Sequence, residues 1–118
     1  MILAVVGSRD FLDYQLLKSN LDCLINTMNI TEIVSGGARG ADKLAEQYAT
    51  QNNLKLTVLN AEWDKHGKAA GYIRNKDIWN YADIGIAFWD GQSKGTNHMI
   101  QTMKGMKKPV YIRLVTCS

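Results

Sequence analysis

The chain has 118 residues, of which 46% are apolar, and it carries a formal net charge of +3. This length predicts one domain over residues 1–118, with a core large enough to fold without disulfide bridges. The small positive charge favours an anionic ligand, but it does not by itself indicate nucleic-acid binding.

Strand-like and helix-like segments alternate along the chain. Apolar runs typical of buried strands occur at Ile2–Val6, Ile30–Val34, Leu54–Leu59, Ile84–Phe88 and Val110–Val115. Between them, apolar residues recur at helical spacing over residues 14–28, 41–52, 73–81 and 99–106. Residues 60–71 show no clear periodicity and are expected to form the longest irregular loop. The alternation predicts the α/β class: a single Rossmann-like three-layer domain with a mostly parallel sheet of about five strands.

The stretch Val34–Asp42 lies between the second strand-like run and a helix start. Three of its residues can adopt backbone angles that let a ligand approach the main chain, and these are Gly36, Gly37 and Gly40. A helix N-terminus offers free N–H groups to an anion, and Arg39 adds a forked donor suited to phosphate. The dinucleotide motif G-x-G-x-x-G is matched only with Ser35 in place of its first glycine. This loop therefore predicts phosphate binding, and the alternative is a tight turn alone.

Three more loops follow the apolar runs, at residues 7–10, 62–71 and 89–96. Because the carboxyl ends of parallel strands meet at one edge of a sheet, these loops and Ser35–Asp42 are expected to form one nucleotide-sized site. The side chains suited to hold phosphates there are Ser8, Arg9, Arg39, Lys68 and Arg74. Trp63 or Trp89 is expected to flank a ring. The alternatives are a helix cap at Ser8, a solvated basic loop around Lys68 and core packing of Trp63.

Residues 91–95 match the G-x-S-x-G nucleophile elbow of hydrolases. The match is rejected because no Asp or Glu follows Asp90, so the acid of a catalytic triad is missing and only His98 remains. Gly95 and Thr96 instead predict a second anion-binding turn, with Ser93 or Thr96 as helix cap or phosphate donor.

Neither a metal site nor a membrane segment is predicted. Cys23 and Cys117 lie far apart and, together with His66 and His98, form no metal-ligand spacing. Two unpaired cysteines favour a reducing, cytoplasmic compartment. The apolar residues 1–6 are too few for a signal or membrane segment.

Taken together, the four loops resemble those of a known family. The motifs that carry the resemblance are Gly7–Phe11, Ser35–Asp42, Trp63–Asn75 and Trp89–Thr96. In this order they are similar to the small YspA/YpsA-type members of the SLOG superfamily, over residues 2–113. That superfamily has a Rossmann-like fold and includes the DNA-processing protein DprA and the "lonely guy" phosphoribohydrolases. The resemblance implies binding of nucleotides or ADP-ribose-like molecules, in some members as part of immune or stress signalling.

The resemblance also bears on catalysis. The phosphoribohydrolases carry a P-G-G-x-G-T-x-x-E motif, whose glutamate supports cleavage of an N-glycosidic bond. In the similar stretch Asp90–Met99, the phosphate-cradling part with Gly95 and Thr96 is kept, but Met99 stands at the glutamate position. Cleavage builds positive charge on the sugar, and a carboxylate is its natural stabiliser. The sequence therefore favours binding over catalysis, with Asp90 as the carboxylate to test if the protein is an enzyme.

The predicted function is to sense or sequester a phosphate-bearing nucleotide, with NAD- or ADP-ribose-derived ligands favoured and no cofactor required. The alternatives are a nucleotide N-glycosidase or phosphoribohydrolase and, with less support, DprA-like binding of single-stranded DNA. A homo-oligomer is also expected, with Met99, Met103 and Met106 as contact residues if they lie outside the core. The predicted ligand-binding residues are Gly7, Ser8, Arg9, Gly36, Gly37, Arg39, Gly40, Asp42, Trp63, His66, Lys68, Arg74, Asn75, Trp89, Gly91, Ser93, Gly95 and Thr96.

Overall fold

The structure is a computed structural model that describes residues 1–115, so the predictions for Cys117 lie outside the described residues. Five strands form one sheet, β1 (Ile2–Gly7), β2 (Glu32–Ser35), β3 (Lys55–Val58), β4 (Ile84–Trp89) and β5 (Val110–Leu114). Their order is β3-β2-β1-β4-β5, and every neighbouring pair is parallel. The sheet is thus entirely parallel, and the strand order reverses between β1 and β4. In such sheets ligands bind beyond the carboxyl ends of the strands at this reversal.

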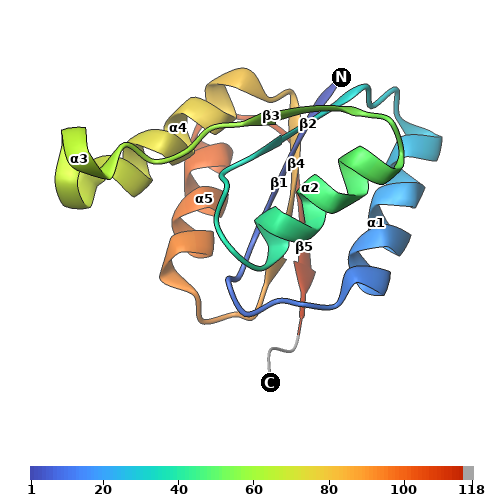
Figure 1. Ribbon diagram of the computed structural model, residues 1–118, viewed down its shortest axis with the longest axis horizontal. Helices are drawn as coiled ribbons and strands as arrows, with labels where there is room; N and C mark the ends of the chain where they lie inside the picture. Colours follow the sequence, from blue (N-terminus) through green and yellow to red (C-terminus); the bar gives the residue numbers. More distant parts are fainter. Residues whose placement is uncertain (116–118) are drawn as a thin grey trace.

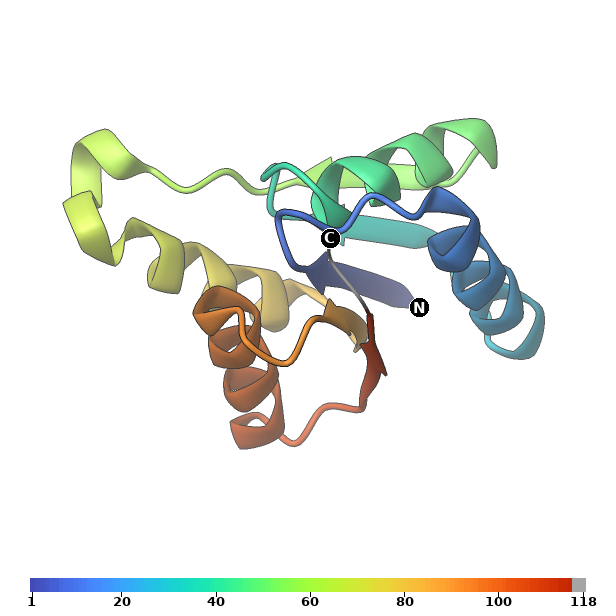
Figure 2. The same cartoon turned by 90° about the horizontal axis from the view of Figure 1, so that it is seen from below.

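Helices cover both faces of the sheet, as Figures 1 and 2 show. They are α1 (Tyr14–Thr27), α2 (Ala41–Gln51), α3 (Trp63–His66), the short 3₁₀ helix η1 (Gly67–Ala69), α4 (Ala70–Tyr81) and α5 (Lys94–Gly105). Helices α1 and α2 pack on one face of the sheet, and α4 and α5 pack on the other. The predicted three-layer Rossmann-like architecture is confirmed.

The sequence of the central strand β1 is continuously apolar because both of its faces are buried. Leu3 and Val5 belong to the core under α1 and α2, whereas Ala4 and Val6 belong to the core under α4 and α5. Successive side chains of a strand point to opposite faces, so a strand covered on both sides has no polar face.

The prediction of an irregular loop over residues 60–71 is wrong. This segment contains α3 and η1, and α4 begins at Ala70, three residues before the predicted helix start at Ile73. Neither α3 nor η1 has a buried residue, and both stand away from the sheet (Figure 2). Helical periodicity in a sequence comes from a buried apolar face, so the sequence of these two turns shows no helical periodicity.

The strand boundaries differ from the predicted ones by one or two residues, and α5 begins at Lys94, five residues before the predicted helical spacing at residue 99. The second strand begins at Glu32 instead of Ile30, and the last strand ends at Leu114 instead of Val115. Met99 and Met103 are buried core residues, 5% and 0% exposed, so they do not form an oligomer surface. Within residues 1–115, no helix combines the length and apolar character needed to span a membrane.

Candidate functional site

A cavity of about 560 Å³ lies at the carboxyl ends of β1, β2 and β4. Its walls come from the residues after β1, the residues after β2, the start of α4 and the loop into α5. The predicted site residues that line it are Gly7, Ser8, Arg9, Gly36, Arg39, Asp42, Arg74, Asn75, Ser93, Gly95 and Thr96. Three of the four predicted loops therefore meet here, together with α4.

The remaining predicted residues lie elsewhere. Gly37 and Trp63 line an adjoining hollow of about 390 Å³. The walls of these two hollows do not include Gly40, His66, Lys68, Trp89 or Gly91. His66 lies in α3 and Lys68 in η1, the turns that project from the sheet. The ring of Trp89 packs against the core under α4 and α5, and its Nε1 donates to the Ser93 carbonyl at 3.1 Å.

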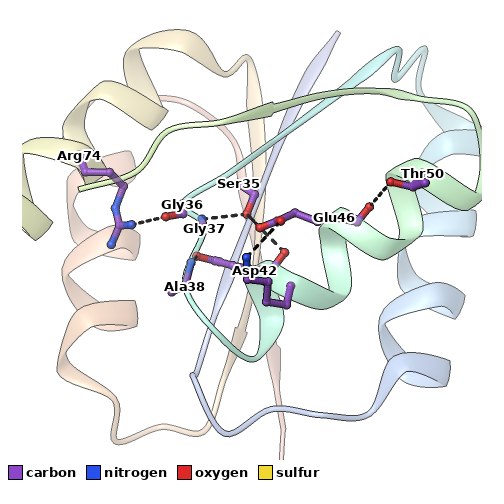
Figure 3. A network of polar contacts seen from close by, with 9 residues as sticks. Ser35, Gly36, Gly37, Ala38, Asp42, Glu46, Thr50 and Arg74 are labelled. Carbon is purple, nitrogen blue, oxygen red and sulfur yellow. Dashed lines mark hydrogen bonds and ion pairs between the residues drawn. The ribbon is translucent and has the colours of Figure 1, made fainter. Parts of the chain in front are cut away.

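The loop after β2 is shaped by hydrogen bonds of its own side chains (Figure 3). The Gly37 N–H donates to Ser35 Oγ at 3.2 Å, and the Ala38 N–H donates to Asp42 Oδ2 at 3.1 Å. Ser35 Oγ in turn donates to Glu46 Oε2 at 3.0 Å. The loop is thus held in one conformation before any ligand binds, which lowers the entropy cost of binding.

Two glycines let the first and second loops pack closely against each other. Gly40 has φ of +76°, and a Cβ there would lie 2.4 Å from the Arg9 carbonyl oxygen. A Cβ on Gly7 would lie 2.6 Å from the Ala41 Cβ. Both residues are needed for the contact between the loops, in addition to any part that Gly7 plays in the cavity wall.

Arg74 reaches across the cavity from α4 to the loop after β2. Its Nη1 donates to the Gly36 carbonyl at 2.6 Å, and its Nε donates to Asn75 Oδ1 at 3.0 Å. Burial lowers the pKa of the Arg74 guanidinium, and the Asp42 carboxylate opposes this shift. The two hydrogen bonds fix the planar guanidinium in the cavity wall and leave further N–H donors for an anion.

Asn75 is buried behind Arg74, and its Nδ2 lies 3.2 Å from His98 Nδ1. The His98 ring is stacked at a tilt on Tyr72, with ring centroids 4.3 Å apart. His98 therefore links α5 to α4 through Asn75 and Tyr72.

Two further arginines, Arg9 and Arg39, extend into the cavity from the first and second loops. Arg39 Nη2 lies 3.5 Å from Asp10 Oδ1, and both of these side chains are 74% exposed. An exposed pair of this kind is weak. Arg39 is therefore free to exchange Asp10 for a phosphate.

The fourth loop caps α5 at the cavity. Ser93 is the N-cap residue, and its Oγ accepts from the Thr96 N–H at 3.4 Å, which confirms the predicted cap. Asp90 Oδ1 accepts from the N–H groups of Gln92 and Ser93 at 2.9 and 2.8 Å. These bonds hold the pKa of the Asp90 carboxyl below its usual value. The α5 N-terminus, with its partial positive charge, borders the cavity through Gly95 and Thr96.

Ser8 joins the first and fourth loops. It is 2% exposed, and its Oγ accepts from the Asp90 N–H at 3.3 Å. The alternative interpretation, a helix cap, is wrong because Asp13 caps α1 by accepting from the Leu16 N–H at 3.1 Å.

Asp42 supplies a pH-dependent contribution to stability. Burial raises the pKa of its carboxyl from 3.8 to about 6, and the Ala38 N–H bond and Arg74 limit the rise. The folded state binds this proton more tightly than the unfolded chain, so stability falls as pH rises from about 4 to about 6. A shift of this size corresponds to about 3 kcal/mol. An Asp42→Asn variant is expected to lose this pH dependence, as measured by denaturant unfolding at pH 4.5 and 7.5. A carbon-13 titration of Asp42 with a midpoint below 4.5 would contradict the expectation.

The fold and the cavity define a class of protein: Rossmann-like α/β domains with a cavity at the point where the strand order reverses. The chain belongs to the YspA, cpYpsA-related SLOG family, whose model matches residues 1–66, the part that contains the first two loops. It is similar to the Gene 61 protein of Mycobacterium phage D29. The two are 38% identical over 84 residues, which cover 66% of this chain and 67% of that protein.

Two solved structures of DNA processing protein A are similar in fold. The Helicobacter pylori protein, which binds single-stranded DNA, matches 95% of this chain with a TM-score of 0.73 at 19% identity. The Streptococcus pneumoniae protein matches 93% of this chain with a TM-score of 0.75 at 21% identity. This chain spans 64% and 49% of the lengths of those two chains. At these identities the likeness concerns the fold.

Proposed function

We propose that the protein binds a phosphate-bearing nucleotide in the cavity at the carboxyl ends of β1, β2 and β4, and so senses or sequesters it. NAD- and ADP-ribose-derived molecules are the first candidates, and AMP-like molecules come next. The observation that carries the proposal is the convergence of three arginines, Arg9, Arg39 and Arg74, with the N-terminus of α5 on one cavity. Forked guanidinium donors and a helix N-terminus are both suited to phosphate oxygens.

The dimensions and the chemistry of the cavity agree with a nucleotide. About 560 Å³ falls in the ordinary range for small-molecule sites. Its wall also contains the side chains of Ser93 and Thr96, whose hydroxyls can donate to phosphate oxygens.

Two observations favour binding over cleavage. Met99, at the position of the phosphoribohydrolase glutamate, contributes an apolar side chain to the cavity wall. Asp90, the carboxylate considered as its replacement, accepts two backbone N–H groups of its own turn. Cleavage of an N-glycosidic bond is assisted by a carboxylate beside the sugar, and neither residue is well suited to that task.

Gly95 offers a direct test. Gly95 lines the cavity, and a Cβ at this position meets nothing within 4 Å, so a side chain there would not disturb the core. A Gly95→Asp variant places a negative charge in the first turn of α5, which favours the helix by about 0.3–1 kcal/mol. The same charge repels a phosphate. The variant is expected to keep or raise its thermal midpoint and to bind ADP-ribose and AMP at least roughly ten-fold more weakly, as measured by calorimetry.

The matched control is Gly95→Asn, which has nearly the same size without the charge. It is expected to bind more tightly than the Asp variant. Equal affinities of the Asp and Asn variants would place the phosphate away from α5 and would overturn the proposed site.

A further inference from the structure

We propose that the site has two compartments and that the smaller one takes the base of the nucleotide, stacked on Trp63. This inference rests on the proposed function and adds the orientation and the class of the ligand. The smaller hollow, of about 390 Å³, adjoins the main cavity. Arg9, Arg39 and Arg74 line both hollows, so the three cations form the boundary between them.

Trp63 gives the smaller hollow an aromatic wall. Its side chain is 53% exposed although it is a large apolar group, and the four-residue helix α3 that carries it has no buried residue. The indole lies against α4, where a Cβ built on Gly71 would be 3.4 Å from its Cη2. The indole therefore contacts α4 near Gly71 but remains about half exposed, and it lines the hollow together with Asn60 and Ala61. An open aromatic face next to arginines is the arrangement on which nucleobases stack.

The larger cavity differs from the smaller hollow because carboxylates and the N-terminus of α5 lie beside the arginines. Its wall includes three carboxylates, those of Asp10, Asp42 and Asp90. Asp42 uses Oδ2 to accept from Ala38, and its Oδ1 accepts no hydrogen bond within residues 1–115. No fully buried side-chain oxygen in that part of the chain lacks a partner, so Asp42 Oδ1 reaches the cavity. Carboxylates repel a second anion and accept hydrogen bonds from hydroxyl groups.

This division orients the ligand. The base lies on Trp63, the phosphates lie between the three arginines and the N-terminus of α5, and a hydroxyl-rich group lies among the carboxylates. A mononucleotide bound in this way would leave the larger cavity empty. The ligand class that fills both compartments is a nucleoside diphosphate that carries a second sugar on its terminal phosphate.

The test compares three probes by calorimetry: ADP-ribose, AMP and ribose 5-phosphate. The wild-type protein is expected to bind them with affinity decreasing in that order. Trp63→Ala is expected to weaken ADP-ribose and AMP by roughly ten-fold, while leaving ribose 5-phosphate unchanged. Trp63→Phe keeps an aromatic face and is expected to restore most of the loss. Tyr111→Ala, which removes an exposed aromatic ring from β5, is the control for loss of an aromatic surface group.

The outcomes separate this inference from the proposed function. If Trp63→Ala binds ADP-ribose and AMP as tightly as the wild-type protein does, the base compartment is overturned while phosphate binding stays in place. Wild-type binding of ribose 5-phosphate as tight as that of ADP-ribose would also overturn the base compartment. A wild-type protein that binds none of the three probes would overturn the proposed function and this inference together.

Discussion

An Arg39→Ala, Arg74→Ala double variant is expected to lose nucleotide binding by at least two orders of magnitude. Each hydrogen bond to a charged partner contributes about 1.5–3 kcal/mol, so the loss of one phosphate contact from each arginine is worth about 3–6 kcal/mol. Arg74 is half-buried and fixed by Gly36, so its guanidinium is held ready for the anion. Arg39 gives up only a weak, exposed ion pair with Asp10 on binding. Calorimetry with ADP-ribose measures the effect.

The control for this variant must remove two cations far from the cavity. Lys76→Ala with Lys104→Ala lowers the net charge by the same amount, and both of these residues are exposed on α4 and α5 and lie outside the cavity wall. The affinity of this control for ADP-ribose is expected to stay within about three-fold of the wild-type value, because salt screens exposed charges at a distance. An arginine double variant that binds as tightly as the control would show that the arginines do not hold the ligand.

A Gly40→Ala variant is expected to lose about 3 kcal/mol of stability or more. The backbone of Gly40 has φ of +76° and ψ of −128°, a region open to glycine and costly for other residues, at about 1–3 kcal/mol. The new Cβ would also lie 2.4 Å from the Arg9 carbonyl oxygen and 2.5 Å from that of Ser8. Main-chain atoms cannot move aside as a flexible side chain can, so overpacking adds about 1–3 kcal/mol. Denaturant unfolding measures the loss.

Gly105→Ala is the matched control, since a Cβ there meets nothing within 4 Å. It lies at the end of α5 and is expected to leave stability unchanged or to raise it by up to about 1 kcal/mol. If both glycine variants unfold at the same denaturant concentration, the close contact between the first and second loops does not contribute to stability.

Much of the fold could be predicted from the sequence because the sheet is covered on both faces. Continuous apolar runs such as Ile2–Val6 leave little choice other than a central strand. The helices α1, α2 and α5 each have a buried apolar face, which gives the helical spacing. The α3 and η1 turns have no such face and were therefore missed.

The part of the candidate site that could be predicted follows from one rule, which is that the loops after parallel strands meet at one edge of the sheet. That rule correctly brought together the loops at Ser8, Gly36 and Gly95, because each follows a strand. The internal bonding of the second loop was not predicted. Ser35, Asp42 and Glu46 make hydrogen bonds that span 2 to 11 residues of the chain, and such contacts depend on the folded path of the loop.

The sequence also does not distinguish the different structural roles of similar residues. Gly40 and Gly95 are alike in sequence, yet Gly40 is packed against Arg9 and Gly95 is open to the cavity. Lys68 lies in the short 3₁₀ helix that stands away from the sheet, whereas Arg74, six residues later, lies in the cavity wall. Tertiary packing alone separates these cases, and one sequence does not reveal it.

The most direct measurement is to incubate the protein with a mixture of nucleotides, NAD and ADP-ribose derivatives and to follow the free compounds by liquid chromatography with mass spectrometry. The protein is then denatured by heat. Depletion of a phosphate-bearing nucleotide, followed by its intact return on heating, is the predicted result and identifies the ligand. Replacement of a compound by free base and sugar phosphate would contradict binding without cleavage. No depletion of any compound at protein concentrations above 100 µM, roughly a level at which even weak binding is visible, would contradict nucleotide binding itself.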